Sequence, residues 1–245
     1  MSLRSFAISV IASFAALSGC VAQDLRGTTG QLGTLRFEYA TADVCDGCAL
    51  DRQVLVGSVL DIEVHGVHPR SRYAVRSTAP GIATFRPISR CRFVGEENCR
   101  DAIAVDAKSA GDADLEVFDE WTGTVLDRVT VKVRDAASID AVVRVASSEG
   151  VSTEKLAANA GGVVELKHNS DVAIVATARS ASGEELIATS DAIRGAYADE
   201  HVIGPRRDHP SSSATEYARA NGPGRTTVSI LGGAARQELS FVVVP

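Results

Sequence analysis

The sequence predicts an all-β protein made of two β-sandwich domains in tandem. Three observations predict this fold class: short runs in which apolar and polar residues alternate, turn residues between these runs, and a hairpin pattern near the end of each half of the chain. Alternation with a period of two is typical of a strand that has one buried face. A series of short strands separated by turns is typical of a sandwich.

Seven alternating runs in the first half predict the strands of the first sandwich. The run 60–64 reads Leu-Asp-Ile-Glu-Val, with apolar side chains expected inside and acids outside. The last two runs flank a turn around Trp121 and Gly123, which predicts a hairpin with a glycine-containing loop. The expected strands are 35–39, 60–64, 73–77, 83–85, 102–106, 113–117 and 125–133.

The hairpin pattern recurs near the C-terminus and indicates a second sandwich. Five positions of the first hairpin match five later positions at one constant spacing, without a gap. A pattern that repeats at a fixed spacing indicates duplicated structural units. The matching positions are Gly111, Leu115, Leu126, Val129 and Val131 in the first half, and Gly224, Val228, Leu239, Val242 and Val244 in the second.

The rest of the second half is less regular. We expect strands at 163–167, 172–179 and 185–189. The loop 180–184, Ser-Ala-Ser-Gly-Glu, is expected to join the last two strands as a hairpin. The segment 195–222 is rich in polar residues, proline and serine, and is expected to contain a long loop of unassigned function.

The first 20 residues have the order of an export signal. Arg4 supplies a positive charge, and the apolar run 5–17 is too short to span a bilayer, which needs about 20 apolar residues. The sequence Leu-Ser-Gly-Cys at 17–20 resembles the lipobox of bacterial lipoproteins. This resemblance implies cleavage before Cys20 and acylation of Cys20, with palmitate among its acyl chains. Three acyl chains would hold the protein firmly on a membrane.

The residues that follow Cys20 extend this interpretation. Val21, in place of Asp, implies by the same resemblance the outer membrane of a two-membrane cell envelope. The next residues are mostly polar or glycine, so we expect a flexible lipidated tether.

The linker between the two sandwiches is short, which predicts little relative movement of the two domains. The expected organisation is signal peptide 1–19, lipidated tether 20–33, first sandwich domain 34–135 and second sandwich domain 136–245.

The net charge of the chain excludes one class of binding partner. The formal net charge is −6, and Lys and Arg do not cluster. Nucleic acid is therefore not an expected partner, because its phosphates are bound through basic patches. No segment after the export signal is long and apolar enough for a transmembrane helix. The membrane is expected to be reached through the N-terminal lipid.

The first half also resembles the group 2 bacterial immunoglobulin-like domains. The resemblance rests on Val-Gly-Ser at 56–58, on Ser-Thr-Ala-Pro-Gly-Ile-Ala-Thr at 77–84, and on Ala-Lys-Ser-Ala-Gly-Asp-Ala at 107–113. It covers roughly residues 34–135, and the second half shares the terminal hairpin. It implies immunoglobulin-like sandwiches that act as stalks, spacers or adhesive modules, with no catalytic residues and no cofactor.

Four cysteines remain after Cys20, in two close pairs that depart from the family pattern. An exported chain reaches an oxidising compartment, so we expect disulfides. Cys45 and Cys48 fall between the first and second expected strands, whereas Cys91 and Cys99 fall between the fourth and fifth. Because successive strands alternate in direction, the pairs lie at opposite ends, and a disulfide needs Cα atoms within about 7 Å. The predicted bonds are Cys45–Cys48 and Cys91–Cys99.

A zinc site is one alternative for these residues. The ligands would be the four cysteines, or Cys45 and Cys48 together with His65 and His68. The first set is too widely separated, and the two histidines of the second set tend to opposite faces of a strand. Calcium is another alternative, because an acidic row offers hard oxygen ligands, although such a row is more often a solvated strand face. This row is Asp112, Asp114, Glu116, Asp119 and Glu120. We therefore expect no bound metal.

The sequence predicts a non-enzymatic structural or adhesive role. Trp121 at the expected hairpin tip either contacts a protein or glycan partner or packs on a neighbouring loop. Ser152 and Lys155 match the Ser-x-x-Lys of penicillin-binding enzymes, but the supporting motifs of those enzymes are absent. The alternatives are a small envelope enzyme or metal-dependent accessory protein, and a subunit of a larger envelope complex. A deep pocket with clustered titratable side chains would favour an enzyme.

Overall fold

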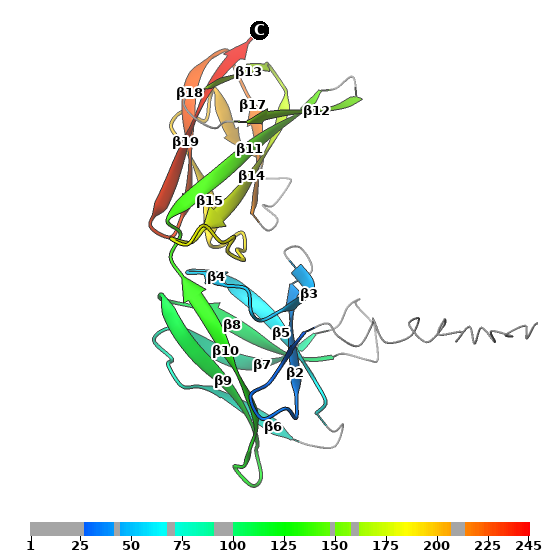
Figure 1. The fold of residues 1–245 in the computed structure, drawn as a ribbon. Helices are drawn as coiled ribbons and strands as arrows, with labels where there is room; N and C mark the ends of the chain where they lie inside the picture. The colour runs from blue at the N-terminus through cyan, green and yellow to red at the C-terminus, as the bar shows by residue number, and fades with distance from the viewer. Residues whose placement is uncertain are drawn as a thin grey trace, which may run out of the picture.

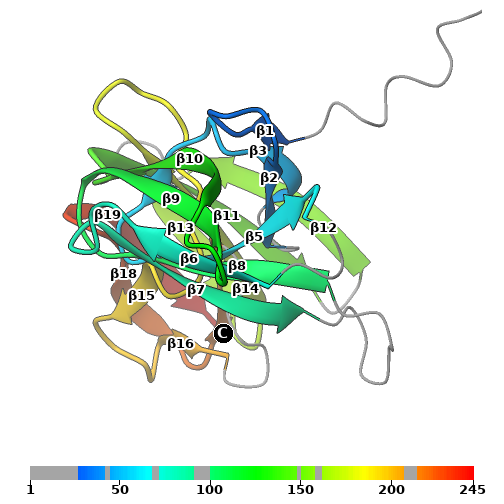
Figure 2. The ribbon, with the colours of Figure 1, turned by 90° about the horizontal axis from the view of Figure 1, so that it is seen from below.

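The chain forms two β-sandwiches joined end to end (Figure 1). A computed structural model describes residues 27–41, 45–67, 72–90, 100–147, 150–157, 162–206 and 214–245. Every regular element in these segments is a strand, and the strands form four sheets. Seen from below, along the long axis of the molecule, the first sandwich lies in front of the second (Figure 2). The predicted all-β fold with two tandem sandwiches is confirmed. Within these segments, no helix is long and apolar enough to cross a membrane.

The first sandwich packs a six-stranded sheet against a four-stranded sheet. Its strands are β1 (Thr28–Thr29), β2 (Arg36–Thr41), β3 (Cys45–Ala49), β4 (Val54–Leu55), β5 (Val59–His65), β6 (Tyr73–Ser77), β7 (Ala83–Arg90), β8 (Arg100–Ala107), β9 (Gly111–Asp119) and β10 (Val125–Arg134). The larger sheet has the order β1-β2-β5-β8-β7, with β3 also paired to β2. The smaller sheet has the order β4-β10-β9-β6.

The second sandwich packs a five-stranded sheet against a four-stranded sheet. Its strands are β11 (Ser138–Ser147), β12 (Gly150–Ala157), β13 (Val163–Lys167), β14 (Asp171–Arg179), β15 (Ile193–Tyr197), β16 (Ile203–Pro205), β17 (Thr215–Ala220), β18 (Gly224–Gly232) and β19 (Ala235–Val244). The two sheets have the orders β12-β11-β14-β17-β16 and β13-β19-β18-β15.

Both sandwiches have the same topology. The order β2-β5-β8-β7 corresponds to β11-β14-β17-β16, and β4-β10-β9-β6 corresponds to β13-β19-β18-β15. In each case a short strand pairs in parallel with the last strand of the sandwich. This is the strand order of an immunoglobulin sandwich, with four strands facing three and a short extra strand at the edge. A further strand pairs as a hairpin with β2 in the first sandwich (β3) and with β11 in the second (β12).

Alternating residues fill one core per sandwich. In β14, Val172, Ile174, Ala176 and Ala178 are buried, while the residues between them are partly exposed. Successive side chains of a strand point to opposite faces of the sheet, so these buried residues all lie on the face that packs against the partner sheet. The largest buried side chains of the first core include Phe37 and Tyr39. Burial raises the pKa of Tyr39, with a further contribution from the negative charge of Asp51.

The repeated hairpin is present, but its second strand is shifted from the predicted match. Leu115 pairs with Val129 in the first hairpin, whereas Val228 pairs with Leu239 in the second. Val129 therefore corresponds to Leu239 rather than to Val242, and the predicted equivalences of Leu126, Val129 and Val131 are wrong. The first hairpin has the longer loop, so a constant spacing cannot hold across it. The equivalence of the first strands holds, because Gly111 and Gly224 occupy the same register position.

Those two glycines also share their surroundings. Gly111 has a φ of 148°, and a Cβ there would lie 2.4 Å from Ile82 Cδ1. Gly224 has a φ of 155°, and a Cβ there would lie 2.8 Å from Val202 Cγ2. Both positions thus combine a positive φ with close packing, which favours glycine. The turn that carries Ile82 lies within the 77–84 stretch on which the group 2 resemblance rests.

Three segments differ from the predicted elements. Residues 27–33, expected in the flexible tether, lie on the first sandwich, where β1 pairs with β2. Residues 185–189, expected as a strand, make only isolated bridges, one of them to β4. The described part of 195–222, expected as a long loop, includes β15, β16 and β17. Residues 1–26 and 207–213 lie outside the described residues.

Candidate functional site

The two sandwiches are joined by backbone pairing between β4 of the first and the segment around Ile187 of the second. Val54 of β4 forms a parallel bridge with Ile187, which lies in the segment after β14. The amide of Ile187 donates to the carbonyl of Gln53 at 2.8 Å, and the amide of Leu55 donates to the carbonyl of Ile187 at 2.8 Å. A pair of backbone hydrogen bonds fixes both distance and orientation, so the joint is more than a linker of short length.

The two sandwiches exchange core side chains at this joint. Ile187, from the second sandwich, is 1% exposed and packs in the core of the first. Leu55, from the first sandwich, is 0% exposed and packs in the core of the second. Burying one such side chain stabilises by about 1.5–3 kcal/mol. Each core is therefore completed by a residue of the other domain.

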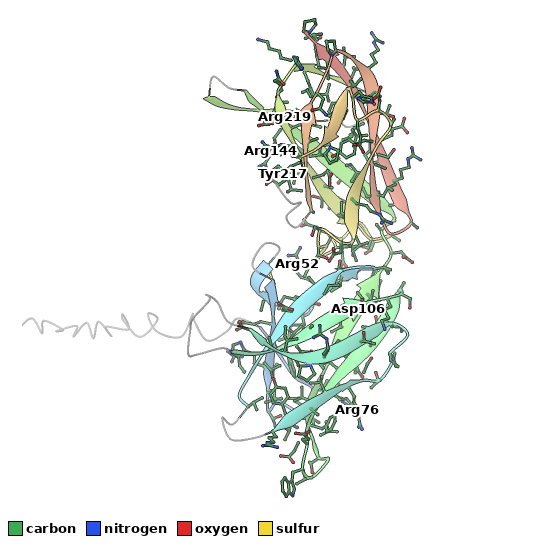
Figure 3. The ribbon with its side chains drawn as sticks, turned by 180° about the vertical axis from the view of Figure 1, so that it is seen from behind. Arg52, Arg76, Asp106, Arg144, Tyr217 and Arg219 are labelled. Atoms are coloured by element: carbon green, nitrogen blue, oxygen red, sulfur yellow. The ribbon has the colours of Figure 1, made fainter. Side chains whose placement is uncertain are left out.

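Polar contacts surround this exchange. The hydroxyl of Thr189 accepts from the amide of Val59 at 3.2 Å, and the amide of Thr189 donates to Ser58 Oγ at 3.4 Å. At the rim, Arg52 Nη2 lies 3.5 Å from Glu185 Oε1. Arg52 lies at the end of the first sandwich that faces the second (Figure 3). We conclude that the joint has a buried apolar centre and a polar rim, as in a stable interface.

A buried carboxylate holds the N-terminal segment on the first sandwich. Asp127 of β10 is 0% exposed. Its oxygens accept hydrogen bonds from the amides of Leu32, Thr34 and Leu35, each at 2.8 Å, and its own neighbour Arg128 donates at 2.8 Å. Burial alone would raise the pKa of Asp127, but these backbone N–H groups together lower it below its usual value. Asp127 is thus a buried, ionised carboxylate that fixes the N-terminal segment to β10 through backbone hydrogen bonds.

The backbone at Gly30 passes so close to Asp127 that no side chain would fit at position 30. A Cβ on Gly30 would lie 2.3 Å from the carboxylate carbon of Asp127. The amide of Gln31 also donates to the carbonyl of Arg128 at 2.8 Å. Asp127 is not among the residues that the sequence singles out, although it falls on the same face of β10 as buried Val129 and Val131. An acid on an apolar row was the available signal.

The hairpin tip presents Trp121 to solvent. Trp121 is 91% exposed, and its loop connects β9 and β10 at the end of the first sandwich away from the joint (Figure 1). The Oδ1 atom of Asp119 accepts from the amides of Trp121 at 3.0 Å and Thr122 at 2.7 Å. These bonds, first that from Thr122, lower the pKa of Asp119. Of the two predicted outcomes, packing on a neighbouring loop is excluded by this exposure.

The acidic row has partners within the protein. Asp112 lies 2.6 Å from Arg134 Nη1, and Glu116 lies 2.6 Å from Arg76 Nε. Asp114 Oδ1 accepts from the hydroxyl of Thr130 at 2.6 Å. The carboxylates thus bind separate partners on neighbouring strands rather than converging on one point. The arrangement is that of a solvated strand face and does not fit the calcium alternative.

The cysteines are described in part. Cys45 and Cys48 lie in β3 and not in a loop, and a register shift interrupts the pairing of β3 with β2 between them. Cys48 carries a disulfide bond. The side chain of Cys45 and residues 91–99 are outside the described part of the chain, so both predicted pairings stay predictions. His68 of the zinc alternative lies outside it as well.

Non-reducing peptide mapping of the purified protein tests the pairing. β3 pairs with the last residues of β2, whereas β7 ends at Arg90 and β8 begins at Arg100 at the opposite end of the larger sheet. We expect fragments linked as 45–48 and 91–99, and the same fragments separated after reduction. A fragment linking 45 or 48 to 91 or 99 would contradict the pairing.

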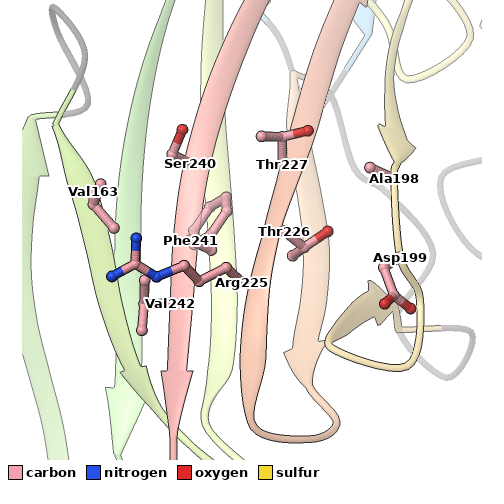
Figure 4. Close-up of a pocket in the computed structure, with 9 residues that line it drawn as sticks. All are labelled: Val163, Ala198, Asp199, Arg225, Thr226, Thr227, Ser240, Phe241 and Val242. Carbon is pink, nitrogen blue, oxygen red and sulfur yellow. The ribbon is translucent and has the colours of Figure 1, made fainter.

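Two surface cavities were candidates for chemistry. One, of about 400 Å³, lies over β13, β18 and β19, and its charged groups, Arg225 and Asp199, are on opposite sides (Figure 4). The other, of about 200 Å³, lies beside the joint, and its charged groups are the paired Arg52 and Glu185. Neither cavity places a nucleophile beside a base. The first cavity is lined by Val163, Ala198, Asp199, Arg225, Thr226, Thr227, Ser240, Phe241 and Val242.

Comparisons with known proteins give distant structural likeness. No protein-family model matches the chain, and no curated protein matches it. Domains 4 and 5 of the S-layer protein SbsC align over 71% of this chain and 77% of theirs, with 13% identity and a TM-score of 0.29. The Escherichia coli adhesin FdeC aligns over 89% and 65%, with 10% identity and a TM-score of 0.30. The D00–D0 domain of intimin aligns over 86% and 100%, with 10% identity and a TM-score of 0.27. Likeness at this level assigns no ligand or activity to the chain.

Proposed function

We propose that the protein is a lipid-anchored protein of the bacterial cell envelope that binds a partner without catalysis through the tip of its first sandwich. The lipobox-like sequence ending at Cys20 supports the anchor, and Val21 supports the outer membrane. The joint supports a rigid spacer role for the pair of immunoglobulin-like sandwiches. The absence of a nucleophile–base pair from the two cavities described above favours binding over the enzyme alternative.

The exposure of Trp121 is the observation that carries the binding proposal. A tryptophan with 91% of its surface exposed leaves a large apolar area in water. Tryptophan is enriched among the residues that dominate binding energy. The loop is already ordered by Asp119, so binding would cost little further loss of conformational freedom. The expected occupant is a protein of the envelope, which buries the indole in a pocket.

Affinity capture from native envelopes tests this proposal. The tagged full chain is expected to fractionate with membranes and to retain one specific envelope protein. Trp121→Ala is expected to weaken this retention at least about tenfold, as loss of a central aromatic contact does. Val163→Ala is the matched control, because Val163 is also an exposed large hydrophobic residue, at 58%, but lies in the second sandwich. Cys20→Ser is expected to release the chain from membranes.

The outcomes separate the parts of the proposal. Equal capture by Trp121→Ala and by the unsubstituted chain would exclude the hairpin tip as the binding surface. Retention of a glycan and no protein would exclude a protein partner. Membrane fractionation of Cys20→Ser would contradict the lipid anchor. A turnover activity that depends on a residue of either cavity would favour the enzyme alternative.

A further inference from the structure

Three metal-ligating side chains converge on the outer face of the larger sheet of the first sandwich. Glu38 of β2 lies directly opposite Glu63 of β5 in the strand register, and His65 follows Glu63 by two residues on the same face. His65 Nε2 lies 3.0 Å from Glu38 Oε1 and 3.8 Å from Glu63 Oε2. One ligand atom from each residue lies within 4.8 Å of the others. Among the described residues, no other group of three meets this distance.

The electrostatics of this cluster favour a cation at its centre. Two carboxylates directly opposite on neighbouring strands repel each other. Their side chains are only 17% and 13% exposed, so water screens this repulsion incompletely. Arg36 lies opposite His65 in the strand register. A divalent ion between Glu38 and Glu63 would neutralise both carboxylates at once.

The imidazole gives a second observation that points to a ligand. His65 Nε2 is a buried atom that makes no hydrogen bond of acceptable geometry with the described residues, although Glu38 Oε1 is 3.0 Å away. A buried polar atom without such a bond is costly, and a metal ion is one way to satisfy an imidazole nitrogen. The His65 side chain as a whole is 42% exposed, so an ion can reach the site from solvent.

We propose that Glu38, Glu63 and His65 bind one divalent transition-metal ion, with Zn²⁺ as the expected ion. Imidazole nitrogen favours zinc over calcium or magnesium, and carboxylate oxygens complete its usual set of ligands. Ligand atoms around a tetrahedral zinc ion lie ~3.3 Å apart, given bonds of about 2.0–2.1 Å. The observed separations of 3.0 and 3.8 Å lie on either side of this value. Three protein ligands leave a fourth position for water or an external carboxylate.

This site is distinct from the zinc sets that the sequence suggested. It uses His65 but neither the cysteines nor His68, and its other ligands come together only through the pairing of β2 with β5. The second sandwich offers a natural contrast. Its corresponding pairing of β11 with β14 places Val142 opposite Val175 and Arg144 opposite Ala173, with no carboxylate pair.

Calorimetric titration of ZnCl₂ into the chelator-treated full chain tests the site. The protein is kept in detergent with its cysteines oxidised. We expect one ion per chain and a higher Tm in the presence of zinc. His65→Gln and Glu63→Gln are each expected to weaken binding by about tenfold or more. His168→Gln is the matched control, since it removes an exposed histidine of the second sandwich.

Folding of the variants is checked separately, by the Tm of each metal-free protein. The Co²⁺ absorption spectrum supplies a second measurement, because a d–d band reports a nitrogen and oxygen ligand set directly. Zinc affinity unchanged in both His65→Gln and Glu63→Gln would overturn the proposal. So would loss of binding in His168→Gln, or saturation only by calcium or magnesium.

Discussion

Replacement of Ile187 by aspartate is expected to convert the two sandwiches into separately unfolding units. Ile187 fills the core of the sandwich to which it does not belong in sequence, and it carries both backbone hydrogen bonds of the joint. A carboxylate cannot be buried in that apolar core without a partner, so the segment must withdraw. The milder Ile187→Ala is expected to lower the free energy of unfolding by about 2–4 kcal/mol.

Calorimetry and small-angle scattering measure this effect. The unsubstituted chain is expected to unfold cooperatively and to scatter as one elongated particle. Ile187→Asp is expected to give two transitions and a broader distribution of interdomain distances. Ile174→Ala is the matched control for Ile187→Ala, because Ile174 is equally buried but lies wholly within the second core. A single transition with unchanged scattering in Ile187→Asp would show that the joint does not couple the domains.

Replacement of Asp127 by asparagine is expected to destabilise the first sandwich by about 3 kcal/mol at pH 7. Asparagine has nearly the same shape, but it removes the negative charge and turns N–H groups toward the backbone donors of Leu32, Thr34 and Leu35. Buried donors left without acceptors carry most of the cost. Urea denaturation measures it, and faster hydrogen exchange of residues 30–35 is expected to accompany it.

The stability that Asp127 contributes is expected to fall as the pH is lowered. The pKa of Asp127 is lowered in the folded protein, so its contribution is present above the unfolded-state pKa and is lost as the pH falls through the folded-state pKa. The stability difference between the unsubstituted chain and Asp127→Asn should therefore shrink in acid below about pH 4. Asp106→Asn, at an exposed carboxylate of the same sandwich, is expected to change stability by less than about 0.5 kcal/mol. A constant difference at every pH would contradict the charge-based explanation.

Most strands could be predicted because their alternation is a local property. The expected strands 73–77 and 163–167 coincide with β6 and β13. The expected strands do not include β11, although Ile139, Ala141 and Val143 alternate with polar or half-buried positions. The two-residue strand β4 has no alternation to detect. It exists because β10 and the segment around Ile187 supply hydrogen-bond partners on either side.

The candidate sites were predictable only where one segment determines them. Trp121 was recognised because a hairpin tip is a local feature. The exchange of Leu55 and Ile187 was not recognised, because an apolar residue carries no mark of the core in which it will lie. The cluster around His65 depends on the register of β2 against β5. Sequence alternation assigns Glu38 and Glu63 to outer faces but does not say that they meet.

The parallel edge pairs have a mechanical consequence. In the second sandwich, the five residues from Val163 to Lys167 pair with those from Ser240 to Val244, and the two strands run in the same direction. A force that pulled β13 from its start and β19 from its end would act along the strands. The hydrogen bonds of the ladder would then share the load instead of opening one after another. Such an edge resists tension along the chain, because the sandwich yields only when the whole ladder slides.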